Sequence, residues 1–365
     1  MANVFSLSGP ISLDQLGIVS LSESLLFGLP GWWYAPDVDY DRAAAFKRIR
    51  SCLEQFREAG GKTIVDTTGI TLGRDVKFYQ RLGEVTGVQI LAATGFGNQP
   101  ESIPGHFYSH AFLYSNVAGP YYWYRDVPGS FYPSYGATKE YLMFLFYNEL
   151  VRGMIAPGMI RTRLRAGMVK TASSWNEVTP VEELSIRGAA MAARRTGVVL
   201  YIAGSINQAS RIMQIATEEG LGPDRMIIGN CDDGRKIDLA RDIEFARKGA
   251  YVAYDHVGWE DPSVPFGLPD ERRVDLVEGM VEAGLAANVV LSCNAIGHAI
   301  GMPQSKQTFA HLLNHFVPRL KTAGVPSRAI DTILTENPRR ILSNRLEEIT
   351  QTVPPYLGGP PTKMY

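Results

Sequence analysis

The stretch that decides the fold is FKRIRSCLEQFREAGGKTIVDTT, residues 46–68. Its first part repeats apolar residues at helical spacing and ends in glycine, the usual residue just after a helix. Its second part is a short β-branched run of the kind that forms a buried strand. A helix followed at once by a buried strand is the unit of folds built on a parallel sheet. We therefore expect this unit to recur along the chain.

Seven further runs have the same strand character, which gives eight in all. Most of them follow an amphipathic stretch such as VEELSIRGAAMAARRTG, which also ends in glycine. Eight strand–helix repeats predict a single α/β domain over residues 1–365, a (β/α)8 TIM barrel whose active site lies at the carboxyl ends of the strands. The eight runs are LGIVSLSES, KTIVDTT, VQILAATG, RAGMVKTA, GVVLYIAG, RMIIGNCDD, GAYVAYDHVG and NVVLSCNA.

The composition favours a globular protein that acts on a small molecule. The chain has 365 residues, 45% of them hydrophobic, and its 36 basic and 37 acidic residues give a net charge of −1. Neither charge forms long blocks, so we expect no nucleic-acid partner and no membrane binding. A signal-like amino terminus and a long apolar span are both missing, which predicts a cytoplasmic protein. Three cysteines far apart in the sequence fit a reducing compartment.

Two segments depart from the repeat, and both are rich in aromatic residues. One is the loop after the first strand, FGLPGWWYAPDVDYD; the other, residues 97–150, follows the third strand and holds fifteen aromatic residues. We expect this insertion to supply pocket walls, a subunit interface or both, and its excess of rings predicts a homodimer. The rings expected to stack on an aromatic substrate are Trp32, Trp33, Tyr122, Trp123 and Tyr135.

Several longer stretches resemble a known family. GPISLDQLG, GGKTIVDTTGITLGRDV, TPVEELSIRGAAMAARRTGV, GPDRMIIGNCDD and NPRRIL follow in order the pattern of the phosphotriesterase-like branch of the amidohydrolase superfamily, which includes resiniferatoxin-binding and parathion-hydrolase-related proteins. The resemblance covers almost the whole chain. It implies a barrel, usually dimeric, that binds two divalent metals through a His-x-His pair, a carboxylated lysine, two single histidines and an aspartate. It also implies hydrolysis of phosphotriesters or lactones.

Only the lysine of that metal-ligand set is kept here. In the family's order, the matching positions are Ser22, Ser24, Lys170, Ala203, Asn230 and Asn294. A zinc or manganese site needs imidazole, thiolate or carboxylate donors. We therefore expect no bound metal and no other cofactor. Because residues two apart in a strand share a face, Ser22 and Ser24 should both face the barrel mouth and bind substrate there, together with the neutral amides of Asn230 and Asn294.

Lys170 is the strongest catalytic candidate. Burial disfavours the ammonium form and lowers its pKa, so the free amine would act as a general base or as a nucleophile toward a carbonyl group. The alternative is a structural lysine paired with Asp66 or Asp255. Tyr201 is a candidate acid and His256 a candidate proton shuttle. Each also has a structural alternative, Tyr201 as a core residue and His256 as a partner of Asp255 or of the backbone.

Three functional hypotheses follow from these residues. The first, which we expect, is a metal-independent lyase that uses general acid–base chemistry on a bulky aromatic small molecule. An example is C–C cleavage or elimination that releases formaldehyde from a lignin-derived phenolic. The second is a phosphotriesterase-like hydrolase of lactones or esters. The third is a non-catalytic binder of aromatic ligands.

Overall fold

All eight predicted strands are present in the computed structural model, which describes residues 3–105, 138–346 and 348–349. The strands are mostly short and buried, and a helix follows most of them along the chain, as the alternation of β-branched runs and amphipathic stretches predicts. The eight strands are β3 (Ile18–Phe27), β4 (Gly61–Asp66), β5 (Gln89–Gly95), β8 (Met168–Thr171), β9 (Leu200–Ile202), β10 (Met226–Ile228), β11 (Tyr251–Tyr254) and β12 (Val289–Leu291).

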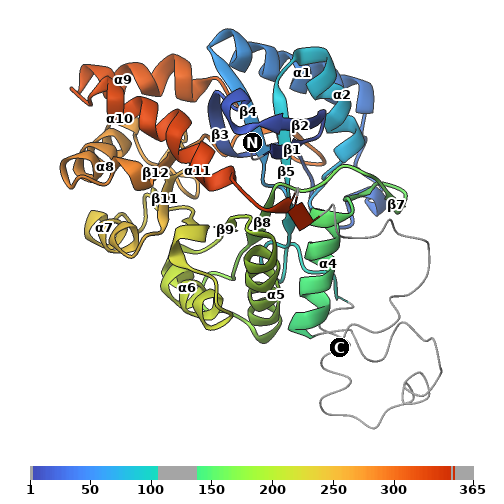
Figure 1. The fold of residues 1–365 in the computed structure, drawn as a ribbon. Helices are drawn as coiled ribbons and strands as arrows, with labels where there is room; N and C mark the ends of the chain where they lie inside the picture. Colours follow the sequence, from blue (N-terminus) through green and yellow to red (C-terminus); the bar gives the residue numbers. More distant parts are fainter. Residues whose placement is uncertain (1–2, 106–137, 347, 350–365) are drawn as a thin grey trace.

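The strands form one curled parallel sheet (Figure 1). The sheet has nine strands in the order β12-β11-β10-β9-β8-β5-β4-β3-β13, and the ninth, β13 (Ile296–Ala299), follows β12 after four residues. Because β13 pairs with β3, the hydrogen bonding returns to the first strand. Asn294 N also donates to Ser22 O, and Ser24 N to Ala295 O, each at 3.0 Å. This arrangement is consistent with the TIM-like barrel that the sequence predicts.

Glu23 holds the seam where the last strand meets the first. Its Oε1 accepts from Cys293 N at 3.0 Å and from the Ser20 hydroxyl at 2.5 Å, and its Oε2 accepts from Ala295 N at 2.7 Å. The carboxyl therefore binds the backbone that joins β12 to β13. Burial raises the pKa of Glu23 to about 8 despite these hydrogen bonds. The pairing of β3 with β4 shifts register between Ser20 and Glu23, so the seam residue lies at an irregular point of the strand.

Helices surround the sheet on its outer side (Figure 1). α5 shows how the sequence sets their ends: Thr179 and Glu182 form a capping box at its start, and Gly197 ends it at φ 73°. The long helices are α1 (Arg42–Glu58), α2 (Val76–Thr86), α4 (Lys139–Val151), α5 (Pro180–Thr196), α6 (Ala209–Glu218), α7 (Leu239–Arg247) and α8 (Asp270–Glu282). Shorter α-helical segments follow: α9 (Val317–Thr322), α10 (Ser327–Asp331) and α11 (Asn337–Leu342).

Four short strands and several single turns complete the described structure. Two antiparallel pairs stand apart from the sheet: β1 (Asn3–Ser6) with β2 (Gly9–Ser12), and β6 (Ile155–Ala156) with β7 (Ile160–Arg161). The single turns are η1 (Leu13–Gln15), η2 (Trp32–Tyr34), η4 (Ile206–Gln208), η5 (Pro223–Arg225), η6 (Ala286–Asn288), η7 (Leu312–Phe316) and η8 (Thr332–Glu336).

Buried side chains divide into two layers, as the two faces of the sheet require. Leu200 and Ile202 of β9 belong to the layer between sheet and helices, whereas Val199 and Tyr201 belong to the layer inside the barrel. The same alternation separates Ile90 from Leu91 in β5. The interior is therefore filled by side chains, and the functional site must lie at one end of the barrel.

The aromatic-rich insertion is described only in part. Tyr122, Trp123 and Tyr135 lie outside the described residues, and the carboxyl-terminal part of the segment forms helix α4. α4 packs against α5 through an apolar face that includes Leu142 and Phe146. Within the described residues, none of the helices is long and apolar enough to cross a membrane.

Candidate functional site

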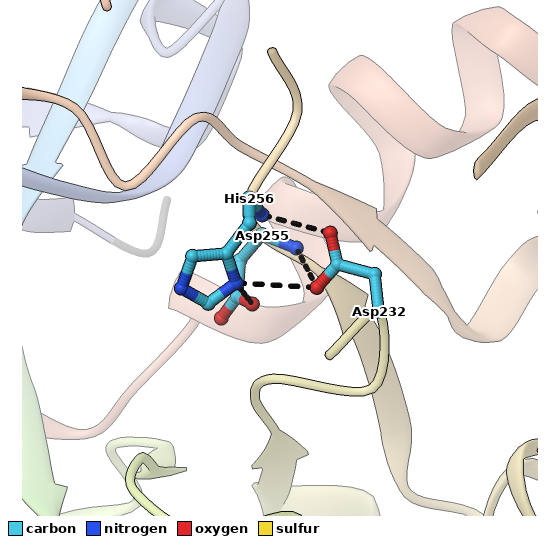
Figure 2. Close-up of side chains that lie close together, drawn as sticks. All are labelled: Asp232, Asp255 and His256. Carbon is cyan, nitrogen blue, oxygen red and sulfur yellow. Dashed lines mark hydrogen bonds and ion pairs between the residues drawn. The ribbon is translucent and has the colours of Figure 1, made fainter. Parts of the chain in front are cut away.

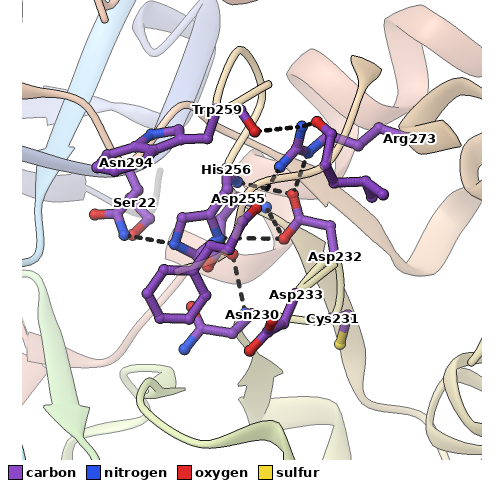
Figure 3. Close-up of polar contacts among 12 residues, drawn as sticks. Ser22, Asn230, Cys231, Asp232, Asp233, Asp255, His256, Trp259, Arg273 and Asn294 are labelled. Carbon is purple, nitrogen blue, oxygen red and sulfur yellow. Dashed lines mark hydrogen bonds and ion pairs between the residues drawn. The ribbon is translucent and has the colours of Figure 1, made fainter. Parts of the chain in front are cut away.

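Polar side chains from five strands meet at the carboxyl-terminal end of the sheet, and Figure 3 shows those that belong to β3 or follow β10, β11 and β12. Parallel strands bring their carboxyl ends to one edge, so residues far apart in the sequence become neighbours there. Within the described residues, most of these side chains are buried and hydrogen-bonded to one another. They are Ser22 on β3, Tyr201 on β9, Asn230 and Asp232 after β10, Asp255 and His256 after β11, and Asn294 after β12.

Tyr201 lies at the centre of the buried part of this network. Ser22 Oγ donates to Tyr201 Oη at 3.0 Å and lies 3.0 Å from Thr67 Oγ1. The phenol in turn donates to Asp255 Oδ2. Burial and the nearby negative charge of Asp255 raise the pKa of Tyr201 well above its ordinary value. The phenol therefore stays protonated and links strands β3 and β9 to the end of β11. Its side chain lies inside the barrel, as predicted, and it also makes polar contacts there.

His256 is bound by two buried carboxylates (Figure 2). Its Nδ1 lies 3.2 Å from Asp232 Oδ1 and 3.2 Å from Asp255 Oδ1, and its backbone N donates to Asp232 Oδ2 at 2.9 Å. Burial alone would lower the pKa of His256, but the hydrogen bonds and charges of the two carboxylates outweigh it and raise the pKa to about 9. The side chain is therefore an imidazolium at neutral pH. It has the predicted partner Asp255 and also Asp232.

The second ring nitrogen of His256 meets Asn294. Nε2 lies 3.0 Å from Asn294 Nδ2. Two N–H donors cannot bond to each other, so from the charge of His256 we infer that the amide is rotated by 180°, with its oxygen at this contact and its NH2 group directed away from the ring. Asn294 is only partly buried, unlike His256. The amide thus carries the polarising effect of the buried cation toward the barrel mouth.

Arg273 of α8 fixes the other side of the network. The guanidinium is fully buried, and its Nε donates to Asp232 Oδ2 at 2.7 Å. Burial would raise the pKa of Asp232, but Arg273 and His256 hold it well below its ordinary range. Arg273 also donates to Phe266 O at 3.0 Å and to Leu268 O, both in the loop after β11. One buried cation therefore holds Asp232 and this loop together.

Asn230 and Asn294 have a backbone reason for being asparagine. Their φ angles are +59° and +44°, in the left-handed region that asparagine tolerates better than most residues. Asn230 N donates to Asp255 Oδ1 at 2.9 Å, and its Nδ2 donates to Gly204 O. Asn230 therefore serves the turn after β10, whereas Asn294 is the better placed of the two to contact a ligand.

Lys170 on β8 stands in a different environment. Its Nζ makes one long contact, 3.5 Å to Thr68 O, and forms no ion pair within the described chain. Burial lowers the pKa of Lys170 to about 8, although Asp66 and Glu101 act in the opposite direction. Asp66 instead accepts from Leu25 N at 2.7 Å and from Thr68. The structure therefore does not pair the lysine directly with Asp66 or Asp255, the structural alternative that the sequence left open.

The residues present do not fit the two-metal centre that the resemblance implies. One oxygen or nitrogen from each of Asp232, Asp255 and His256 lies within 4.8 Å of the others, a spacing that a metal ion could span. The two carboxylates already accept hydrogen bonds from Arg273, Tyr201 and the backbone amide of Asn230. The hydroxyls and amides at the family's ligand positions add no strong donor.

Among the residues that the structure describes, the other sequence-predicted site residues are Ser24, Trp32 and Trp33, and none of their described side-chain contacts reaches this network. Ser24 is buried in β3 and donates its backbone N–H across the seam. Trp32 packs edge-on against Trp33 and Tyr40, with ring centroids 5.8 and 5.3 Å apart. Among the described contacts, none joins Trp32 or Trp33 to His256 or Lys170.

Three residues of the mouth were not predicted from the sequence. The Phe266 ring stacks on the His256 ring, with centroids 4.2 Å apart and planes 10° apart. The Arg235 guanidinium lies 4.1 Å from the Trp175 ring centroid and 5.3 Å from that of Phe266. The arginine follows the pair of aspartates in NCDDGR, which was the only local signal; nothing in the sequence pattern marks Phe266 or Trp175.

Comparisons with known proteins agree with this geometry. The sequence model of the phosphotriesterase family matches residues 3–118 and 115–342. The chain is 26% identical to an aryldialkylphosphatase from Saccharolobus solfataricus, over 83% of this chain and 88% of that protein. It is 26% identical to an N-acetyltaurine hydrolase from Xenopus tropicalis, over 79% and 75% respectively. The structure of an organophosphorus hydrolase from Deinococcus radiodurans matches with a TM-score of 0.79 at 25% identity, covering 93% of this chain and 96% of that one.

These names correct the functional expectation. The aryldialkylphosphatase, the N-acetyltaurine hydrolase and the organophosphorus hydrolase cleave bonds with water, so the predicted lyase is wrong and the hydrolase alternative fits better. The expectation of a lyase came from the missing metal ligands. The metal-ligand positions indicate whether a metal can bind, and they do not specify which bond of the substrate is cleaved.

Proposed function

This chain belongs to the phosphotriesterase family, and from its site we propose that it hydrolyses a carboxylic ester or lactone of a small molecule. The observation that carries the proposal is Lys170, an amine with a pKa of about 8 and no ion pair within the described chain, at the end of the sheet where the polar network also lies. Such an amine is a competent general base near neutral pH.

The reaction needs a base for water and a donor for the oxygen that becomes negative. In our proposal, Lys170 Nζ takes a proton from water as the water oxygen bonds to the carbonyl carbon. The tetrahedral intermediate then collapses, the C–O bond to the leaving alcohol breaks, and the ammonium returns the proton to that alcohol. The Asn294 NH2 group, polarised by the His256 imidazolium, donates to the carbonyl oxygen as its charge develops.

The buried network has a supporting role in this proposal. Arg273 and two carboxylates hold His256 charged and in one orientation, so the charge behind Asn294 is fixed before the substrate arrives. Tyr201 and Asp255 bind each other within the same network. An aromatic substrate, a homodimer and a cytoplasmic location remain predictions.

The test is hydrolysis of an aryl ester, a δ-lactone, an N-acyl amine and a dialkyl aryl phosphate by the purified protein. We expect turnover of the ester and the lactone, unchanged by exhaustive chelation because the site offers no metal ligands that are free to bind. Lys170→Met keeps the apolar stem and should lower kcat at least about a hundredfold, the scale for loss of a general base. Lys170→Arg should fail as well, because a guanidinium stays protonated.

Lys236→Met is the matched control, because Lys236 is an exposed lysine that follows β10 on the same side of the sheet. It should hydrolyse the substrates at the wild-type rate, and circular dichroism should show all variants folded. Near-normal turnover by Lys170→Met would remove the proposed base, and failure to hydrolyse either the ester or the lactone would remove the proposed function.

A further inference from the structure

Four planar groups form a continuous stack beside the network. The His256 ring lies under the Phe266 ring at 4.2 Å, Arg235 lies over Phe266 at 5.3 Å, and the same guanidinium lies over Trp175 at 4.1 Å. The stack begins at the buried imidazolium and ends at a tryptophan that is 38% exposed. It therefore leads from the buried ring beside Asn294 outward to solvent.

The members of the stack come from three loops at the same end of the barrel. Trp175 follows β8, the strand that carries Lys170; Arg235 follows β10; and Phe266 lies in the loop after β11. Loops after the carboxyl ends of the strands form the active-site mouth in folds of this kind. The position of Arg235 is thus on the side of the molecule that a substrate must approach.

The backbone of Phe266 has a strained conformation. Its φ is +67°, a conformation that a bulky residue rarely adopts. Arg273 holds this turn, because its Nη2 donates to Phe266 O at 3.0 Å. Strain of this type persists where the surroundings fix it, commonly at functional sites.

The Arg235 guanidinium is held in place with one edge still free. Its Nε and Nη2 donate to the two oxygens of Asp233 at 2.9 and 2.8 Å. The side chain is 46% exposed, whereas Asp233 is fully buried. Its Nη1 has no hydrogen-bond partner among the residues that the structure describes. A guanidinium fixed in this way can bind a planar carboxylate through its remaining donors with little loss of freedom.

We propose that Arg235 is a specificity-determining residue that binds a carboxylate on the substrate, while Trp175 stacks on the planar part that carries it. This inference rests on the proposed function and names its substrate class: esters or lactones of small molecules that bear a second, uncleaved carboxylate. The neutral lining near Lys170 and Asn294 receives the scissile carbonyl, and the cation at the rim receives the charged end.

The test compares two phenyl acetates that differ at one group, 4-carboxyphenyl acetate and 4-carbamoylphenyl acetate. For the wild-type protein, we expect a KM at least tenfold lower for the carboxylate. Arg235→Met should raise the KM for the carboxylate at least tenfold with kcat within about twofold, and should leave the KM for the carboxamide unchanged. Arg235→Lys should retain part of the preference, because it keeps the charge and loses the planar pair of donors.

A second variant and a binding measurement keep the proposal falsifiable. Arg235→Met leaves Asp233 buried without its partner, so the double variant Arg235→Met with Asp233→Asn should give the same kinetic result in a folded protein. Calorimetric titration with benzoate and benzamide measures the preference without turnover, and wild type should bind benzoate at least tenfold more tightly than the double variant does.

Equal effects of Arg235→Met on the two esters, or no effect on either, would overturn the role of Arg235 while leaving the hydrolase intact. Hydrolysis of neither ester, together with an Arg235-dependent preference for benzoate, would instead overturn the proposed function and retain the anion site. Equal binding of benzoate and benzamide would overturn the anion site.

Discussion

The two sides of the barrel mouth differ in how far their polar groups are satisfied. Around His256, Asp232, Asp255 and Arg273 bind one another and the backbone at 2.7–3.3 Å. On the opposite part of the sheet, the Lys170 amine has one contact at 3.5 Å. The difference indicates two roles. The network around His256 is a fixed charged framework, whereas the Lys170 amine is free to exchange a proton.

The same comparison separates stability from activity. Buried charges that bind one another are strongly destabilising when one partner is removed, because the remaining charge stays in a place that water cannot reach. A buried amine with few partners is costly to desolvate, so its removal should leave the fold at least as stable and should mainly affect chemistry. Substitutions on the two sides should therefore have opposite consequences.

The largest effect is expected at Arg273. Replacing it by methionine leaves Asp232 without a guanidinium and Asp270 with His311 and Arg319 alone, and breaking a buried pair of this kind costs about 3–5 kcal/mol. Urea unfolding of Arg273→Met should show this loss of free energy of unfolding. The neighbouring Arg272→Met is the control, because Arg272 and its partner Asp275 are 62% and 56% exposed. It should change stability by less than about 1 kcal/mol. Similar values for the two variants would show that the charged framework does not stabilise the fold.

A smaller loss is expected at Tyr201. Tyr201→Phe removes the proton that Asp255 accepts and leaves Ser22 one partner fewer, at about 1.5–3 kcal/mol for a hydrogen bond to a charged group. Thermal and urea unfolding measure it. Tyr34→Phe makes the same change at a side chain that is 82% exposed and should be neutral. An unchanged midpoint for Tyr201→Phe would break the view that this phenol organises the barrel interior.

The next smaller effect is expected in the pH dependence of hydrolysis. Because Lys170 must be unprotonated to accept a proton, kcat/KM should rise about tenfold per pH unit below its pKa of about 8 and level off above it. Initial rates measured between about pH 5.5 and about pH 9.5 give the profile. A rate that falls as pH rises through 8 would contradict the assignment of Lys170 as the base.

The stability of the folded state has its own dependence on this amine. The folded pKa of about 8 lies below the ordinary value of 10.5, so between these values the unfolded chain binds a proton that the folded chain has released. The contribution of Lys170 to stability therefore increases as pH rises through that window. Activity and this contribution to stability both increase with pH. The increase in activity ends near pH 8, where the increase in stability begins.

The strands were predictable because their signal is local. Each of the runs quoted from the sequence became a strand of the sheet, and the glycine after VEELSIRGAAMAARRT ends α5 as expected. The inward position of Tyr201 also followed from the alternation along its strand. These features depend on residues within a few positions of one another, and a single sequence contains that information.

The partners within the site were less predictable because they are distant in sequence. Arg273 reaches Asp232 from 41 positions away, and no spacing rule links a residue on a helix to a particular loop. His256 was expected beside Asp255, but its second carboxylate partner comes from another strand end. The stack on Phe266 depends on a left-handed backbone that nothing in the local sequence indicates.

The seam held by Glu23 has a consequence for how the chain folds. Its contacts join residues 270 and 272 positions apart, whereas most neighbouring strands are joined by a single helix and its loops. Such distant contacts carry a large loop-closure entropy and form only after the intervening units have been ordered. We therefore expect the barrel to close late in folding, so that weakening the carboxyl at that seam acts mainly on the rate of unfolding.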